Sequence, residues 1–266
     1  MIKCIERGEM DNRIDMVVGT LIYRAGAYIL DKFLENQKKI QGNYPSSELV
    51  LATVEKDFVA ELKEMLSRWG VRGEVILYET VKPDYAISIV YWNCSCGREA
   101  IRKYALEKGA SYLLFIDADL ICDPQVINIL KKEINGYDIV ACGYAGKRHG
   151  TVVGGLGFTL ITSDALKKMT YRCYEFKNHK VLDEGEVVGM DSFEKRLKFK
   201  NGYFLTVDHY DRDGSFGHIE PHSMSLLKKV ANCLFVRYML MKTSIIVKYN
   251  IPTSLKSYYL GFFQRD

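Results

Sequence analysis

Short apolar runs alternate with amphipathic segments along the first 145 residues of the chain. The runs that are typical of buried strands span residues 16–22, 49–54, 75–78, 112–116 and 139–142. Apolar residues at helical spacing predict helices over residues 27–40, 59–69, 97–108 and 124–134. Strands and helices that alternate in this way predict a mostly parallel sheet with helices on both faces, so we expect an α/β fold.

The pattern changes near residue 150. Residues 152–161 are rich in glycine and then strand-like, and the spacing predicts helices over 164–169 and 191–200 and a strand over 203–207. We expect these elements to extend the same sheet and not to form an independent domain. The predicted organisation is one domain over residues 1–225, with halves at about 14–146 and 147–225, followed by an extension over 226–266.

Composition narrows the class of protein. Hydrophobic residues make up 48% of the chain and charged residues 26%, values that are ordinary for a globular protein and exclude wholesale disorder. No apolar run approaches the roughly 18 residues that span a bilayer, and residues 1–13 lack the apolar core of a secretory signal. The 7 cysteines show no C-x-x-C spacing, so we expect reduced thiols in a cytoplasmic protein.

The net charge of +4 is unevenly distributed. The net positive charge is concentrated in residues 226–266, whereas the rest of the chain is near neutral and does not indicate nucleic-acid binding. One helical stripe in this extension contains Leu227, Val230, Leu234, Tyr238, Met241 and Ile245. An apolar stripe beside basic and aromatic residues predicts peripheral contact with an anionic membrane face, and a core-packing helix is the alternative.

The strongest candidate for chemistry is Asp117-Ala118-Asp119, which follows the apolar run 112–116. In extended backbone, residues i and i+2 face the same side, so the two carboxylates lie together at the edge where α/β sheets bind ligands. Such a pair repels itself unless a cation lies between its members, and Mg²⁺ and Mn²⁺ prefer oxygen ligands that they share with phosphates. This predicts a metal and nucleotide-diphosphate site. The alternatives are acids that cap the next helix, or a plain turn.

Two other motifs carry less information. The glycines of residues 154–157 match neither a dinucleotide fingerprint nor a phosphate-binding loop with its lysine, and they indicate a close approach of the backbone to a ligand or a strand. A second acid pair, Asp211-Arg212-Asp213, precedes Gly214 and predicts a polar turn.

Further segments that contribute to a family resemblance lie before and after the acid pair in the sequence. They are residues 17–24, 48–55, Arg98 with 104–109, 155–161, Asp191 with 193–203, and 217–219. With Asp117-Ala118-Asp119 as the D-x-D motif, they resemble the glycosyltransferases of the GT-A fold, most closely the family-two type, over about residues 16–218. The resemblance implies a Rossmann-like GT-A fold and transfer of a sugar, with inversion, from a UDP- or GDP-sugar to a glycan, protein or lipid-linked acceptor. It also implies Mn²⁺ or Mg²⁺, which offsets the charge of the leaving diphosphate.

The resemblance also implies roles for individual residues. Donor contacts fall on Thr20, Tyr23, Arg24, Glu55, Arg98, Asp117 and Ala118, and acceptor-side contacts fall on Gly155, Leu156 and Gly157. Metal contacts fall on Asp117, Asp119 and His218, and His209 is the alternative histidine. Asp191 is the predicted base that takes the acceptor's hydroxyl proton, with a helix N-cap as the alternative.

Two other functions stay open at this point. Met190 stands where the family usually has Glu, which keeps a catalytically inactive sugar- or nucleotide-binding protein as an alternative. A sugar nucleotidyltransferase is the third hypothesis. That class usually opens with a glycine-rich basic loop, which residues 21–24 do not provide.

Overall fold

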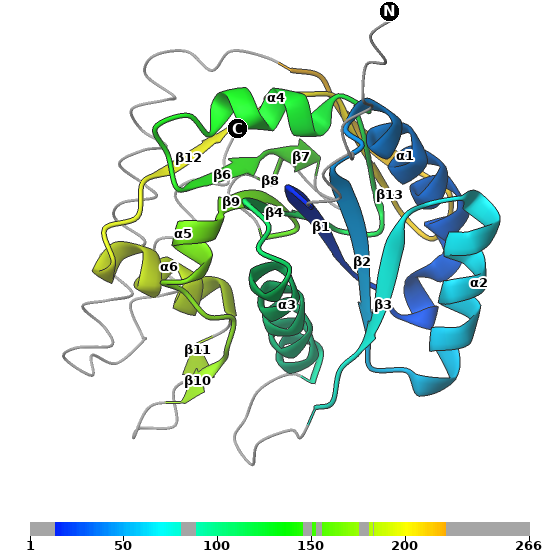
Figure 1. Ribbon diagram of the computed structural model, residues 1–266, viewed down its shortest axis with the longest axis horizontal. Coiled ribbons are helices and arrows are strands. Elements are labelled where there is room, and N and C mark those ends of the chain that lie inside the picture. The colour runs from blue at the N-terminus through cyan, green and yellow to red at the C-terminus, as the bar shows by residue number, and fades with distance from the viewer. Residues whose placement is uncertain are drawn as a thin grey trace, which may run out of the picture.

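A seven-stranded central sheet organises the chain. The computed structural model describes residues 14–80, 89–145, 151–152, 156–175, 181–182 and 184–221. The sheet has the order β12-β6-β9-β4-β1-β2-β3, and Figure 1 shows its strands side by side. Its strands are β1 (Met16–Leu21), β2 (Ser47–Thr53), β3 (Gly73–Leu77), β4 (Tyr112–Ile116), β6 (Ile139–Cys142), β9 (Phe158–Thr162) and β12 (Phe199–Gly202). Only β9 runs antiparallel to its neighbours in this sheet, so the predicted mostly parallel α/β sheet is confirmed.

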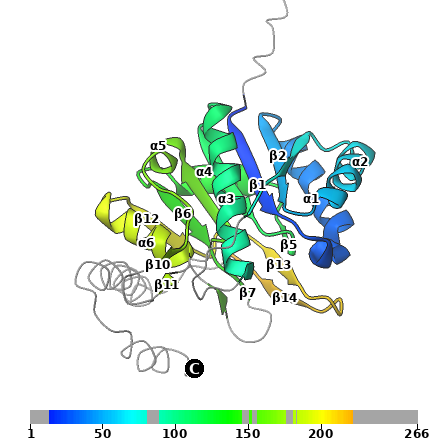
Figure 2. The ribbon, with the colours of Figure 1, turned by 90° about the horizontal axis from the view of Figure 1, so that it is seen from below.

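Helices cover both faces of the sheet (Figures 1 and 2). On one face lie α1 (Leu30–Asn43), α2 (Val59–Trp69) and α4 (Val126–Glu133), and on the other lie α3 (Ile89–Glu107), α5 (Ser163–Leu166) and α6 (Glu184–Glu194). Two short 3₁₀ helices, η1 (Arg24–Ile29) and η2 (Lys56–Phe58), precede α1 and α2. Because strand residues alternate between faces, Met16 and Val18 pack in one apolar core and Val17 packs in the other.

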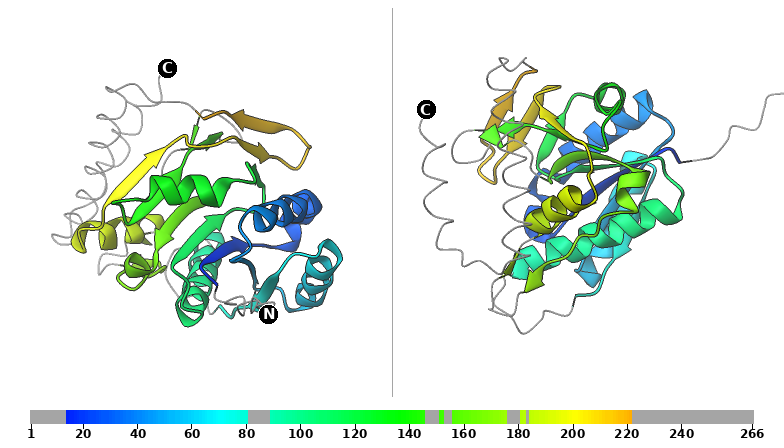
Figure 3. Two further views of the ribbon diagram at one scale, coloured as in Figure 1. Left: turned by 45° about the horizontal axis from the view of Figure 1, so that its top comes forward. Right: turned by 90° about the vertical axis from the view of Figure 1, so that its left-hand side faces the viewer.

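A second, smaller sheet lies beside the end of β4. It joins β5 (Leu120–Cys122), β13 (Val207–Tyr210) and β14 (Phe216–Ile219) in the antiparallel order β14-β13-β5. Figure 3 shows the gold β13–β14 ribbon next to the central sheet. Short pairs are formed by β7 (Tyr144–Ala145) with β8 (Thr151–Val152) and by β10 (Tyr174–Glu175) with β11 (Val181–Leu182). Since β5 follows β4 after three residues, the acid pair lies where the two sheets meet.

The predicted helix over 191–200 and strand over 203–207 are wrong in position. The helix α6 ends at Glu194, and residues 199–202 form β12, which pairs with β6 at the edge of the sheet. Phe193 lies within the predicted helix with a side chain that is 43% exposed, whereas Val187 and Val188 earlier in the chain are buried. The next strand is β13, which starts at Val207 because it pairs with β5.

Some expectations concern parts of the chain that the structure does not describe. The extension over residues 226–266, with its predicted membrane contact, lies outside the described residues. Among the helices that are described, none combines the length and the apolar character needed to cross a bilayer.

The buried Asn36 of α1 ties this helix to β5. Its side-chain amide donates to the Cys122 carbonyl at 2.8 Å and accepts from the Cys122 amide at 3.3 Å. We predict that Asn36→Leu destabilises the protein by about 1–3 kcal/mol for each backbone group left unpaired, measured by urea unfolding. Asn43→Ala is the matched control, because the exposed Asn43 amide donates to the Pro124 carbonyl at 3.2 Å and its loss should change stability by less than about 0.5 kcal/mol. Equal losses in the two variants would contradict the prediction.

Candidate functional site

The backbone around Asp117 is fixed from several sides. The Asp117 amide donates to the Gly157 carbonyl at 2.8 Å, and the Leu120 amide donates to the Asp117 carbonyl at 3.0 Å. The buried Thr20 hydroxyl donates to the Ile116 carbonyl at 2.8 Å. Thr20, predicted to contact a donor, therefore ties β1 to the end of β4. The acid pair lies in a tight turn between β4 and β5, and Asp123 accepts from the Gln125 amide at 2.7 Å at the start of the following helix.

Arg98 of α3 faces the first acid of the pair. Its guanidinium lies 3.3 Å from Asp117 and also pairs with Glu184, the first residue of α6. Burial acts to lower the pKa of Arg98, but the Glu184 and Asp117 carboxylates outweigh it and raise the pKa above its ordinary value. Burial and the nearby charge of Asp119 raise the pKa of Asp117 above its ordinary value, although the positive charge of Arg98 acts to lower it. The positive charge of Arg98 is thus shared between two carboxylates.

The second acid of the pair faces a histidine. Asp119 lies 3.4 Å from the Nε2 atom of the buried His209, and the Nδ1 atom of His209 lies 2.6 Å from the Ala145 carbonyl. A carbonyl can only accept, so Nδ1 carries the proton and, in the neutral ring, Nε2 presents a lone pair toward Asp119. An imidazole lone pair and a carboxylate oxygen at this separation suit a shared cation.

The structure does not bring His218 to the acid pair. His218 lies opposite Asp208 in the β13–β14 register, whereas His209 lies opposite Gly217, so the two histidines point to opposite faces of the ribbon. The His218 ring contacts Asp208 at 2.5 Å and Glu220 at 2.8 Å, and its side chain is 45% exposed. The predicted metal role of His218 is therefore corrected in favour of the alternative, His209.

Asp191 also differs from its predicted setting. It lies near the end of α6 and not at a helix N-terminus, so the N-cap alternative is wrong as well. Its buried carboxylate accepts from the Thr170 amide at 3.2 Å and pairs with Arg172 at 3.2 Å. These contacts hold α6 against residues 170–172, which precede it in the chain. The base role predicted for Asp191 does not fit a carboxylate held in this way.

Predicted donor residues do converge at the carboxyl ends of β1 and β2. The Arg24 amide donates to Glu55 at 2.6 Å, while the Arg24 guanidinium pairs with Glu61 at 2.8 Å. The Tyr23 and Tyr78 hydroxyls lie 2.8 Å apart, and burial is the main cause that raises the pKa of Tyr23. The edge beyond the carboxyl ends of the strands is where α/β sheets bind ligands.

Two glycines allow close approach at the site. A Cβ atom on Gly157 would collide with the Asp117 carboxylate, and one on Gly97 would lie 2.9 Å from the Tyr78 hydroxyl. The backbone of Gly157 thus lies directly against the Asp117 carboxylate. Leu156 packs against the core on the α3 face, and Ala118 is buried. Gly155 lies outside the described residues.

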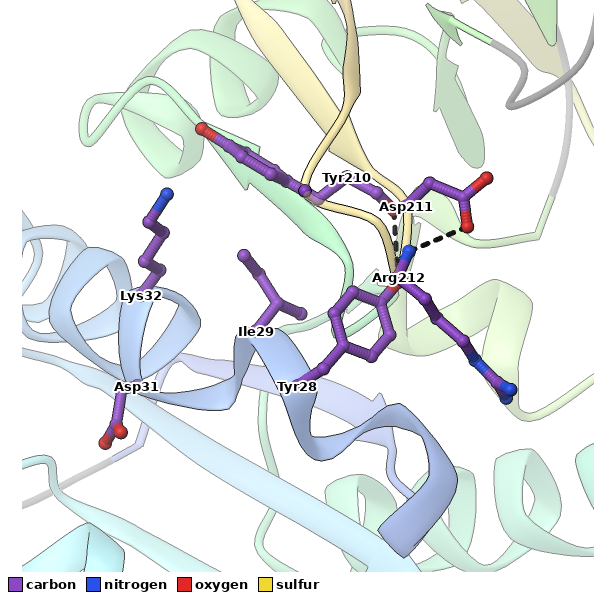
Figure 4. A pocket seen from close by; sticks show the side chains of 8 residues that line it. Tyr28, Ile29, Asp31, Lys32, Tyr210, Asp211 and Arg212 are labelled. Atoms are coloured by element: carbon purple, nitrogen blue, oxygen red, sulfur yellow. Dashed lines mark hydrogen bonds between the residues drawn. The ribbon is translucent and has the colours of Figure 1, made fainter.

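A pocket of about 220 Å³ lies on the other side of β13 (Figure 4). Its lining comes from the end of η1, the start of α1, and the end of β13 with the turn that follows it, namely Tyr28, Ile29, Asp31, Lys32, Tyr210, Asp211, Arg212 and Gly214. The Tyr28 hydroxyl donates to the Tyr210 carbonyl at 3.1 Å, and the Tyr210 amide donates to the Asp119 carbonyl at 2.9 Å. Asp211 and Gly214 close the polar turn that the sequence predicts.

Sequence reasoning missed Glu184 and Tyr78. Neither carries a local signal, because an acid at the start of a helix and a tyrosine after a strand are ordinary. Within the described part of the chain, no group of three or more His, Cys, Asp or Glu side chains forms a complete metal site. Asp119 and His209 are two donors, and a phosphate-bound Mg²⁺ or Mn²⁺ takes its remaining ligands from phosphate oxygens and water.

Comparison with known proteins gives distant likenesses only. No family model matches the chain, and no curated protein matches it. Similar solved structures include S. aureus TarS (14% identity, TM-score 0.49, covering 72% of this chain and 36% of TarS). Others are the mannosyltransferase PcManGT from Pyrobaculum calidifontis in complex with GDP-Man and Mn²⁺ (12%, 0.47, 71% and 54%) and a cytidylyltransferase from Leptospira borgpetersenii (11%, 0.45, 90% and 94%).

The chain thus spans about a third of the length of TarS. A mannosyltransferase and a cytidylyltransferase are both among the similar structures, so likeness of this kind does not choose between the activities. The function is therefore argued from this chain's own residues.

The contact between Gly157 and Asp117 gives a test. We predict that Gly157→Ala displaces the Asp117 carboxylate and lowers the free energy of unfolding by about 1–3 kcal/mol, because the added methyl group overpacks the site. Gly42→Ala is the control: a Cβ atom there meets nothing within 4 Å, so in helix α1 it should be neutral or stabilise by up to about 1 kcal/mol. Chemical denaturation of both variants checks this, and an unchanged stability of Gly157→Ala refutes it.

The contacts of His218 predict a pH effect. Hydrogen bonds to Asp208 and Glu220 raise the pKa of His218 above 6.5. A raised pKa in the folded protein stabilises it fully below pH 6.5, and the benefit is lost as the pH rises through the folded value. We therefore expect the stability difference between wild type and His218→Gln to shrink as the pH rises above about 6.5 in denaturant titrations. A difference independent of pH would count against the ion pairs.

Proposed function

We propose that this protein is a metal-dependent glycosyltransferase that moves a sugar from a nucleotide-diphosphate sugar to an acceptor. The observation that carries the proposal is the pair Asp117 and Asp119 at the carboxyl end of a buried strand. One acid faces a buried arginine, and the other faces the Nε2 atom of His209. This arrangement has the charge and the donor atoms for a divalent cation bound to a diphosphate.

The residues present fit such a cation. Asp119 supplies a carboxylate oxygen and His209 a nitrogen, and the Ala145 carbonyl holds the histidine in the tautomer that leaves Nε2 as the donor. A bound Mn²⁺ or Mg²⁺ would stabilise the negative charge that develops on the departing diphosphate. Asp117 stays beside the nucleotide as an acceptor, and its backbone is held by Gly157 and Leu120.

The nucleoside is proposed to lie at the cluster of Tyr23, Arg24, Glu55 and Tyr78. This cluster follows β1, β2 and β3, at the same edge of the sheet as the acid pair. UDP and GDP are the expected diphosphates, and one similar structure holds UDP-GlcNAc and another GDP-Man. The acceptor is a glycan, a protein or a lipid-linked molecule that enters on the Gly157 side.

One part of the proposal is adjusted to the geometry. Asp191 is not used as the base, because its carboxylate is buried against Arg172 and the Thr170 amide. On sequence grounds, we also propose that residues 226–266 contact an anionic lipid surface.

The decisive assay follows product formation from a panel of nucleotide-sugars with Mn²⁺. We predict that Asp119→Asn and His209→Gln each lower turnover by more than the roughly 10–100-fold that loss of an outer-shell partner costs, because each removes a metal ligand. Matched to these, His218→Gln is expected to retain turnover within about threefold, since His218 points to the other face of the ribbon. Circular dichroism confirms that each variant is folded.

The opposite ranking of the two histidine variants would move the metal from His209 to His218. Release of nucleoside diphosphate is the signature of sugar transfer, whereas a nucleotidyltransferase releases pyrophosphate. Pyrophosphate from a nucleoside triphosphate and a sugar phosphate would overturn the proposed activity.

A further inference from the structure

We propose that Glu184 is a positioning residue, which holds Arg98 so that Asp117 keeps a carboxylate oxygen available to nucleotide and metal. This inference rests on the proposed function, because it concerns the same site. It assigns a role to α6, whose first residue reaches the acid pair through one intervening side chain.

The burial of the three side chains supports this order of contacts. Arg98 and Glu184 are 9% and 8% exposed, whereas Asp117 is 38% exposed. Arg98 contacts Asp117 through one nitrogen only, at 3.3 Å, and the other terminal nitrogen is taken by Glu184. Glu184 therefore contacts the guanidinium on its buried side. Asp117 contacts it on the more exposed side, where a ligand can reach.

The electrostatics show what Glu184 contributes. A buried guanidinium with a single carboxylate partner favours a two-bond fork with that partner. Without the Glu184 charge, Arg98 would turn both terminal nitrogens toward Asp117, because among the described residues Arg98 forms ion pairs with these two carboxylates alone. Asp117 would then lose acceptor capacity and negative potential at the point where a cation binds. Because Glu184 pairs with Arg98, the Arg98 charge is shared between the Glu184 and Asp117 carboxylates.

A purely structural role for Glu184 is the rival explanation. It would fix α6 to α3, and its loss would cost stability alone. The same helix offers a matched control, since Asp191 lies seven residues later and is also a buried carboxylate paired with an arginine, Arg172. This second pair ties α6 to the segment before it and does not touch the acid pair.

The test compares Glu184→Gln with Asp191→Asn by two readouts, the melting temperature and the affinity for Mn²⁺ with UDP or GDP, followed by electron paramagnetic resonance. We expect both variants to lower the melting temperature. Glu184→Gln alone should weaken Mn²⁺ binding by about 10-fold or more, the scale of an outer-shell change. Asp191→Asn should leave that affinity within about twofold. Equal Mn²⁺ affinity in wild type and Glu184→Gln overturns the inference.

A comparison of Arg98→Gln with the double variant covers the case in which Glu184→Gln does not fold. Removing both charges with Arg98→Gln avoids a lone buried charge, so the double variant is expected to fold. Because Glu184 acts through Arg98, adding Glu184→Gln to Arg98→Gln should not weaken Mn²⁺ binding further, and a further 10-fold loss would overturn the inference.

A crystal structure of metal-free Glu184→Gln separates this inference from the proposed function. Two bonds from Arg98 to Asp117 support the positioning role, and an unchanged single contact overturns it. Wild-type protein that binds no Mn²⁺ with either diphosphate would refute the metal-dependent activity, while the crystal structure would still decide the role of Glu184.

Discussion

The negative charge of two carboxylates at the end of strand β4 is the constraint around which the site is arranged. Asp117 and Asp119 lie two residues apart, where like charges raise each other's energy unless positive groups are near. Arg98 brings a positive charge to the first acid from α3, and His209 brings an imidazole nitrogen beside the second from β13. Arg98 and His209 are more than 100 residues apart in the chain, so only the folded sheet brings them to the acid pair.

The buried guanidinium of Arg98, which offsets the charge of Asp117, itself needs carboxylate partners. A guanidinium as buried as that of Arg98 is unfavourable without a full counter-charge, and Asp117 alone would have to supply it. Glu184 provides a second carboxylate from the core side. The site therefore depends on α6 as well as on the strand ends, and on the close packing that Gly97 and Gly157 permit.

The strands and the acid pair could be predicted from sequence because their signals are local. An apolar run such as residues 112–116 marks a buried strand, and two acids directly after it mark the edge where ligands bind. The choice between His209 and His218 depends on the register of β13 with β14, which no local pattern fixes, and a shift by one residue would exchange the faces of the ribbon. Glu184 escaped prediction for the same reason: its partner lies 86 residues away. The N-cap alternative for Asp191 is wrong because α6 begins earlier than the periodicity indicates.

The most direct test of the account is the position of the metal itself. Crystals grown with UDP or GDP and Mn²⁺ can be measured at the manganese absorption edge, where the anomalous signal locates the ion without reference to the protein. The account predicts one strong peak within coordination distance, roughly 2.0–2.3 Å, of an Asp119 oxygen and of the His209 Nε2 atom, with diphosphate oxygens completing the shell. A peak at His218, Asp208 and Glu220 instead, or bound nucleotide with no manganese beside Asp119, would contradict it.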